Sequence, residues 1–502
     1  MKSISLAALG LMLTVSAPAL AQSDAAGAVT ESEDSDVIIV TARKREENLQ
    51  DVPLTINVTS AETIDKAKLT NISDLAAQTP GFSYKQGFGR TGGGGGAGVR
   101  PSIRGMSSVV GAPNAAFFVD GIFVSDNIAS YQLENLERVE VIKGPQSALF
   151  GRQTFSGAVN YVTRKPSTDG LTGRFKISIA EHNSSEVSGF LSGPIIRDRL
   201  GFEVNIRQNK FGGDYVNNDI QKTGKLGAQR SFSVGGRLLW TPSDNFEALA
   251  SFGLSDDRDN GYVYGFQGSA KNNCFAPPIV ATIPFPRTPT NRRGFFCGEI
   301  KILPAYTYND REIEDAGYHA LDRRFMRTSL AMTGRTDSGW SMTSITAYNR
   351  NNSITGQDNS LVPTSNANFA VDQSRTKDFS QELKVISPAD QPIRGLVGVY
   401  YYKDDSLSGF QFTSANRSRR TFDSADGVRS KAVYGMIEAD FGEGLTAGAE
   451  ARYQSETIRG STEVLAPVGS NDVPPRRPPH CAAPSSTHSC RASRCAGNRA
   501  PT

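Results

Sequence analysis

The sequence predicts a small α/β domain followed by an antiparallel transmembrane β-barrel that is incomplete, in a chain of 502 residues. Three observations lead to this fold class: an export signal, a segment that mixes helix and strand patterns, and about eleven later segments of alternating apolar and polar side chains. The mean hydropathy is −0.35. Because no internal run reaches the ~20 apolar residues of a spanning helix, a helical membrane protein is excluded.

Residues 1–21 have the pattern of a signal peptide. Lys2 supplies the positive start, Ile4 to Val15 the short apolar stretch, and Ala19-Leu20-Ala21 the small-residue cleavage site. We therefore expect an exported chain that begins near Gln22 after cleavage. A buried N-terminal helix is the alternative.

Charge and cysteine content limit the classes of partner. The net charge of +3 comes from residues 466–502, which hold five arginines and one acid, so no basic face for nucleic acid is expected. Three cysteines, Cys481, Cys490 and Cys495, lie in that tail. The other two, Cys274 and Cys297, are 23 residues apart in a loop-like stretch, where an exported chain can form a disulfide; two free thiols are the alternative.

Residues 22–50 are predicted to be a flexible lead that carries one strand-forming run. The run, which is bounded by charged residues, consists of Asp36, Val37, Ile38, Ile39, Val40, Thr41 and Ala42. Its β-branched side chains favour a strand that pairs with the sheet edge of a partner. An edge strand of the following domain is the alternative.

Residues 51–166 are predicted to form the mixed α/β domain. Asp51–Val58 is predicted to be a strand, Ser60 to cap a helix from Ala61, and a second helix to start at Ser73. The expected later elements are a hairpin over Phe117–Val124 around Asp120-Gly121, a strand over Leu136–Lys143, and a strand over Gly157–Thr163.

Several blocks of this domain resemble the plug of TonB-dependent receptors. The blocks occur in the family's order: Ile103-Arg104-Gly105, Val119-Asp120-Gly121, Arg138 to Pro145, Leu149-Phe150-Gly151-Arg152, and Gly157-Ala158-Val159-Asn160. Asp36–Ala42 resembles the TonB box, and the likeness covers residues 36–166. Gln153–Ser156 departs from the family, which usually has small residues and Asn there. The resemblance implies a ligand site on apical plug loops, for which the candidates are Tyr84, Phe88, Arg90, Arg100 and Tyr131.

A glycine-rich stretch competes with this interpretation only weakly. Gly93, Gly95 and Gly98 satisfy the dinucleotide-binding pattern GxGxxG. No apolar strand precedes them and Pro101 would block the following helix, so we expect a flexible surface loop instead.

Residues 167–465 are predicted to form barrel strands with apolar side chains facing lipid and polar ones facing the lumen. The expected strands are 171–180, 185–192, 201–211, 231–240, 245–255, 326–336, 340–350, 378–387, 395–404, 430–441 and 444–455. Connections after even-numbered strands are short, and those after odd-numbered strands, among them 351–377 and 405–429, are mostly long. This parity favours a membrane barrel over a soluble sandwich.

The barrel pattern stops at about 11 of the roughly 22 strands of a plugged transporter. Residues 474–502 lack Val, Ile, Leu, Met, Phe, Tyr and Trp, which is typical of a frameshift product; a genuine Pro/Arg-rich tail is the alternative. We expect a barrel that stays open to fail to assemble, because lipid does not tolerate unpaired strand edges.

The resemblance implies active uptake of a scarce ligand, most often a ferric siderophore, across the outer membrane. It implies TonB with ExbB and ExbD as partners, besides the ligand and outer-membrane lipid. No cofactor, metal site or catalytic constellation is expected, and His182 and His319 alone precede the tail. The rival functions are a passive porin, an exported hydrolase or dinucleotide enzyme, and a truncated receptor without activity.

Overall fold

The computed structural model describes the plug region and the long strands, with gaps mainly in the loops. The described residues are 38–85, 100–106, 113–125, 128, 131, 133, 136–213, 215–216, 225–261, 272–275, 294–295, 297–298, 320–358, 369–413, 419–442 and 444–468. The predicted signal peptide, the glycine-rich loop and residues 469–502 lie outside them. The chain divides into residues 1–38, of which Ile38 alone is described, and residues 39–502.

A five-stranded mixed sheet forms the centre of the N-terminal domain. Its strands lie in the order β3 (Thr55–Ser60), β9 (Leu136–Lys143), β10 (Gly157–Thr163), β7 (Ala115–Val119) and β8 (Ile122–Val124). Only β10 and β7 are parallel. The strand predicted from Asp51 begins at Thr55 instead, because Leu49–Asp51 form a 3-10 turn and Pro53, which has no N–H to donate, follows it.

Two short helices cover this sheet, and local capping explains where each begins. The Ser60 hydroxyl accepts the Thr63 N–H at the start of α1 (Ala61–Lys66). At α2 (Ile72–Gln78), Asn71 and Asp74 form a reciprocal capping box, so this helix starts one residue before the predicted Ser73. Among the described residues, no helix is long and apolar enough to cross a membrane.

The predicted hairpin is confirmed at the turn between β7 and β8. Asp120 and Gly121 have φ of 51° and 77°, the left-handed pair that a tight two-residue hairpin turn requires. The Asp120 carboxylate accepts both the N–H and the hydroxyl of Thr163, at 2.8 and 2.7 Å. The turn is therefore hydrogen-bonded to the end of β10.

Beside this sheet, β4 (Phe82–Lys85) pairs with β6 (Arg100–Ile103).

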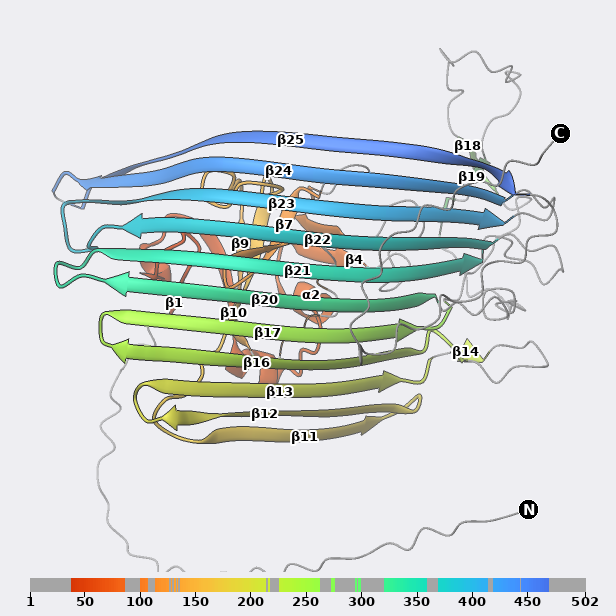
Figure 1. Ribbon diagram of the computed structural model, residues 1–502, viewed down its shortest axis with the longest axis horizontal. Helices are drawn as coiled ribbons and strands as arrows, with labels where there is room; N and C mark the ends of the chain where they lie inside the picture. The colour runs from red at the N-terminus through yellow and green to blue at the C-terminus, as the bar shows by residue number, and fades with distance from the viewer. Residues whose placement is uncertain are drawn as a thin grey trace, which may run out of the picture. The chain divides into compact units, whose positions relative to one another are not determined.

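Eleven long strands form one antiparallel sheet in chain order, as Figure 1 shows. They are β11 (Thr172–Ala180), β12 (Ser184–Ile196), β13 (Leu200–Phe211), β16 (Gln229–Ser243), β17 (Phe246–Asp259), β20 (Leu321–Arg335), β21 (Ser341–Asp358), β22 (Phe369–Ile386), β23 (Ile393–Thr413), β24 (Arg419–Asp440) and β25 (Thr446–Val468). Each predicted barrel segment corresponds to one of these strands. Besides β4 with β6, the described residues form three further two-stranded ladders: β1 (Ile39–Val40) with β2 (Glu47–Asn48), β14 (Tyr215–Val216) with β15 (Lys225–Leu226), and β18 (Cys274–Phe275) with β19 (Gly294–Phe295).

The last strands are much longer than their apolar alternation predicted. The predicted long loops 351–377 and 405–429 are wrong, because β21 and β22 are joined by residues 359–368 and β23 and β24 by residues 414–418. A strand of 23 residues such as β25 extends roughly 75 Å, far beyond the ~25 Å apolar band of a membrane barrel. Outside that band the strands do not contact lipid, so their apolar side chains need not alternate with polar ones. Hydrogen-bonded pairing of the strands continues there without this alternation.

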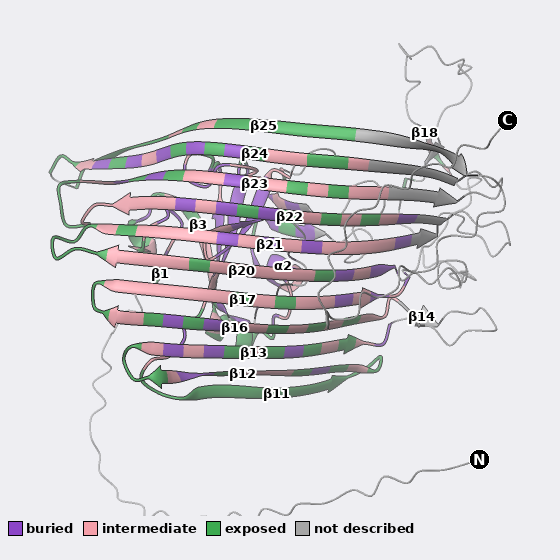
Figure 2. Cartoon of the chain, viewed as in Figure 1, coloured by how far each residue is buried: buried purple, intermediate pink, exposed green. Residues whose placement is uncertain are grey.

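The two faces of the plug sheet have different neighbours. On β7, Phe117 and Val119 belong to the internal plug core beneath the helices, whereas Ala116 and Phe118 belong to a second cluster. That second cluster also contains side chains of the long strands, namely Leu396, Tyr402, Tyr434 and Met436. The plug therefore packs directly on β23 and β24. Figure 2 shows that β11 and β25, the edge strands of the described sheet, are exposed along most of their described residues.

Candidate functional site

The described part of the predicted TonB box runs from exposed residues into the plug core. Asp36 and Val37 lie outside the described residues, and Ile38 and Ile39 are 44% and 40% exposed. Ile39 is opposite Asn48 in the ladder of β1 and β2. Val40 and Ala42 are completely buried in the cluster that joins the plug to the long strands. This placement has features of both sequence-based alternatives, an exposed lead and an edge strand.

Thr41 fixes the box to the middle of the plug sheet. Its N–H donates to the Glu140 carboxylate at 2.9 Å, and its hydroxyl lies 3.1 and 3.2 Å from the two carboxylate oxygens. The Arg138 Nε donates to the same carboxylate at 2.8 Å, and the Asn160 amide donates to the Thr41 hydroxyl at 3.1 Å. Since Glu140 is fully buried, this network replaces the water that its charge would otherwise need.

The three basic residues after the box connect it to the barrel wall. The chain turns back at Lys44, whose φ is 61° and whose N–H donates to the Thr41 carbonyl at 2.9 Å. Arg43 forms ion pairs with Glu47 and with Glu438 of β24. Burial lowers the pKa of Arg43, but these two carboxylates outweigh it and the pKa is raised. The Arg43 guanidinium therefore remains charged.

Lys44 lies against both a carboxylate and aromatic rings of the wall. Its ammonium forms an ion pair with Glu382 of β22 and lies 5.4, 5.9 and 5.1 Å from the ring centroids of Phe150, Tyr400 and Tyr434. The Lys44 carbonyl accepts the Lys384 ammonium at 2.7 Å. The guanidinium of Arg45 completes the group at Glu438. Sequence patterns indicated Arg43, Lys44 and Arg45 only as a charged boundary of the box. No local pattern pointed to Glu382 and Glu438 as their partners.

The described candidate ligand residues, Tyr84, Arg100 and Tyr131, lie in different parts of the plug. Phe88 and Arg90 fall outside the described residues, and of Arg100 only the backbone, in β6, is described. Tyr84 is buried in the internal plug core with its ring edge-on to Phe117 at 5.8 Å. Tyr131 lies at the boundary between the plug and the wall, with its ring 5.4 Å from that of Tyr161. Burial raises the pKa of the Tyr131 and Tyr161 phenols.

A cavity of about 180 Å³ lies between the plug and the wall beside Tyr131. The plug lines it with Asp120, Ile122 and Ile128, among others, and the wall lines it with residues of β13, β16, β17, β20 and β21. Arg237 crosses the boundary here, since it donates to the carbonyl of Arg164 and lies 3.5 Å from an Asp120 carboxylate oxygen. Among the described residues, no three His, Cys, Asp or Glu side chains are grouped as metal ligands.

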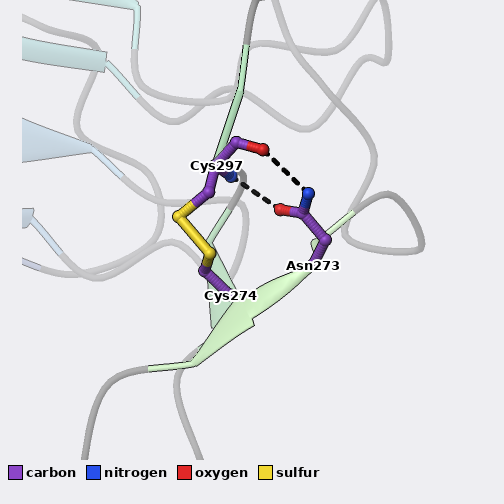
Figure 3. Close-up of a disulfide and its surroundings, with 3 residues drawn as sticks. All are labelled: Asn273, Cys274 and Cys297. Atoms are coloured by element: carbon purple, nitrogen blue, oxygen red, sulfur yellow. Dashed lines mark hydrogen bonds between the residues drawn. A yellow bond between two sulfur atoms is a disulfide. The ribbon is translucent and has the colours of Figure 1, made fainter.

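Cys274 and Cys297 are joined by a disulfide at the paired strands β18 and β19, as Figure 3 shows. The Asn273 side chain holds the Cys297 backbone through two hydrogen bonds. Its amide donates to the Cys297 carbonyl at 2.8 Å and accepts the Cys297 N–H at 2.6 Å. The two cysteines lie between β17 and β20, in the longest connection of the sheet. The bridge therefore closes a loop of this connection.

Known proteins share this arrangement of a plug domain and long strands. The family model for the TonB-dependent receptor plug domain matches residues 48–158, which include β3 to β9 and the start of β10. This part of the chain is therefore the plug domain of a TonB-dependent receptor. The same family explains the order of the domains, a plug followed by an antiparallel sheet of barrel type.

Relatives in sequence are receptors and transporters. The vitamin B12 transporter BtuB of Vibrio vulnificus is 29% identical over 34% of this chain and 28% of its own length. The probable TonB-dependent siderophore receptor PirA of Acinetobacter baumannii is 27% identical over 51% of this chain and 38% of its own length. The chain thus spans well under half the length of these relatives.

Solved structures share the fold. The ferric yersiniabactin uptake receptor FyuA of Yersinia pestis matches with a TM-score of 0.57 and 18% identity, over 82% of this chain and 62% of that chain. The ferripyoverdine receptor of the outer membrane of Pseudomonas aeruginosa matches with a TM-score of 0.63 and 13% identity, over 86% and 56%. Both matches extend beyond the plug into the long strands, which supports the barrel fold of the sheet.

Proposed function

We propose that this chain acts in TonB-dependent uptake of a scarce ligand, a ferric siderophore, across the outer membrane of a Gram-negative bacterium. The observation that carries the proposal is the plug domain anchored to the wall strands through the residues that follow the predicted TonB box. A channel that opens only when energy is supplied needs such a plug. A passive porin does not need one.

The choice of ligand class rests on the relatives. Besides PirA, they include the ferrioxamine receptor of Yersinia enterocolitica, which is 24% identical over 44% of this chain. Vitamin B12, named for BtuB, is the alternative cargo. In this proposal the chemistry is binding and transport, with no covalent step and no resident cofactor.

The proposed partner is TonB, driven by ExbB and ExbD. The segment Asp36–Ala42 would add as a strand to the TonB sheet, a mode in which main-chain hydrogen bonds supply the affinity. Ile38 and Ile39 are partly exposed, which offers a starting point for that pairing. Complete pairing would withdraw Val40 and Ala42 from the cluster that now buries them.

The test is uptake of radioactive iron by a receptor-deficient strain that produces a version of this chain with a completed barrel. Iron is supplied as ferrioxamine, ferric yersiniabactin or ferripyoverdine, with and without a functional TonB. The expected result is uptake of at least one chelate that requires TonB. Entry at the same rate without TonB would indicate a passive channel, and no uptake of any chelate would contradict the proposal.

A further inference from the structure

A row of four neighbouring residues, two of them glycines, lines one side of the cavity between the plug and the wall. Gly235 of β16, Gly253 of β17 and Arg327 of β20 are direct neighbours across three strands, and Asn349 of β21 continues the row. All four residues line the cavity. A side chain added at Gly253 would meet no atom within 4 Å at its Cβ. Gly253 therefore leaves open space beside the Arg327 side chain, whereas the Asn205 side chain fills the position of a Cβ at Gly235.

Arg327 enters this space with its charge incompletely satisfied. Its Nη1 atom is buried and has no hydrogen-bond partner among the described residues. The guanidinium lies 5.4 Å from the ring centroid of Tyr131 and 5.9 Å from that of Phe325, within the range of a cation–π contact. These rings hold the cation in place but offer Nη1 no hydrogen-bond acceptor. A buried donor without an acceptor is destabilising, so an acceptor placed here would be bound favourably.

The other charged groups around the cavity already have partners. Arg323 donates to the Asp257 carboxylate at 2.9 and 3.1 Å, and Arg237 is held by Asp120 and the Arg164 carbonyl. Asp378 lies next to Asn349 in the same row, but its carboxylate accepts from Ser125 and Asn349, both at 2.7 Å. Tyr131 stays neutral, since burial raises its pKa. The lining thus has room for one more negative charge, at Arg327.

We propose that this cavity binds one small aromatic carboxylate, with the carboxylate on Arg327 and the ring over Gly253. The ring would lie among Ile122, Ile128, Tyr131 and Phe325, which are apolar or aromatic lining residues from both the plug and the wall. The cavity of about 180 Å³ suits one substituted ring, because an engineered apolar cavity of about 150 Å³ is known to hold benzene. A guanidinium presents paired N–H donors that match a carboxylate.

The carboxylate has two sources, a free acid or the pendant arm of a chelate that is being transported. The second source rests on the uptake function proposed above, whereas the first does not. Binding to the purified chain separates this inference from that function, because it requires neither TonB nor transport. The probe is benzoate, measured by calorimetry on the full chain refolded in detergent, with benzamide as its neutral counterpart.

The expected result is saturable benzoate binding that is at least about tenfold tighter than benzamide binding. Arg327→Met should weaken benzoate binding about tenfold or more and should remove the preference over benzamide. Arg324→Met is the matched control, because Arg324 lies three residues away on the opposite face of β20, where it is exposed and paired with Asp256 at 2.9 Å. That variant should bind benzoate as the parent does.

A second pair of variants tests the space rather than the charge. Gly253→Leu should fill the cavity and abolish binding, whereas Gly334→Leu on β20 should not, since Gly334 also has open space around its Cβ but does not line the cavity. Unchanged strand content by circular dichroism shows that each variant is folded. No benzoate binding at about 10 mM to the folded parent, or unchanged binding in Arg327→Met, overturns the proposal.

The iron(III) complex of 2,3-dihydroxybenzoate identifies the source. Its catechol oxygens coordinate iron and leave carboxylates free on the rings. If the complex displaces benzoate from the parent chain, the site accepts the arm of a chelate. If benzoate binds but is not displaced, the site takes the free acid, and the link to uptake is abandoned while the carboxylate site stands.

Discussion

Thr41 donates its backbone N–H to the Glu140 carboxylate at 2.9 Å, so one buried acid holds the centre of the predicted TonB box in the plug. The two residues are 99 positions apart in sequence, and Asn160 on the neighbouring strand donates to the Thr41 hydroxyl. The box is therefore stabilised by the plug sheet itself. Its release must break this network.

The first prediction follows from that contact. Glu140→Ala removes the acceptor of both Thr41 donors, so the box should leave the plug more often. A cysteine placed at the fully buried Val40 is the reporter, in a background whose tail cysteines are serine. Its rate of labelling by a maleimide should rise about tenfold or more, because opening becomes easier by at least the ~1.4 kcal/mol that corresponds to a factor of ten.

Glu137→Ala is the control for this experiment. Glu137 lies on the same strand, but its side chain is 52% exposed and contacts Arg138 rather than the box. Its replacement should leave the labelling rate unchanged. Equal labelling of Val40→Cys with and without Glu140 would show that other contacts hold the box.

The second prediction concerns strand addition at Ile39. Ile39→Pro should weaken binding of the purified TonB C-terminal domain by about tenfold or more, because proline removes a donor from the paired strand. In cells that produce a repaired version with a completed barrel, the same change should abolish TonB-dependent uptake while leaving ligand binding intact. Ile39→Val keeps the donor and the β-branched shape and should behave as the parent. Undiminished TonB binding by Ile39→Pro refutes the coupling role of this segment.

The third prediction concerns the anchor at Lys44. Lys44→Met leaves the Glu382 carboxylate buried without its ammonium partner, and removal of one member of a buried pair costs roughly 3 kcal/mol. The urea midpoint of the plug transition should fall accordingly. The double variant Lys44→Met with Glu382→Gln should recover part of the loss, since the buried carboxylate that lost its ammonium partner is then neutral. Lys66→Met is the control, because its ion pair with Glu62 is solvent-exposed and should contribute nothing measurable.

Local patterns were sufficient to predict the elements of the fold. Asp120-Gly121 gave the hairpin because few residues adopt φ > 0 at two successive positions. Alternation gave each of the eleven long strands, because lipid on one side and the lumen on the other force a period of two. The outer ends of β21 to β24 were missed, because the strands remain paired there although no lipid contact requires alternating side chains.

Contacts between distant segments were not predictable in the same way. Tyr84 was chosen as an apical residue, but it lies in the plug core because β4 pairs with β6 and packs its ring on Phe117. The basic residues after the box gave no indication of their partners, which lie more than 330 positions away on β22 and β24. Such ion pairs depend on how the plug packs against the wall strands, and no local sequence pattern indicates that packing.

The last prediction concerns the bridge between Cys274 and Cys297. In a chain whose tail cysteines are serine, a denatured sample should take up no thiol label without reductant and two labels after reduction. A bridge that closes a loop of this size restricts the unfolded chain by roughly 3 kcal/mol in the chain-entropy model. Replacing both cysteines by serine should therefore make the connection between β17 and β20 more sensitive to protease. Asn273→Ala removes only the two hydrogen bonds to Cys297 and should leave the bridge formed. Two labels without reductant would show free thiols, and the stabilising role of the bridge would then be withdrawn.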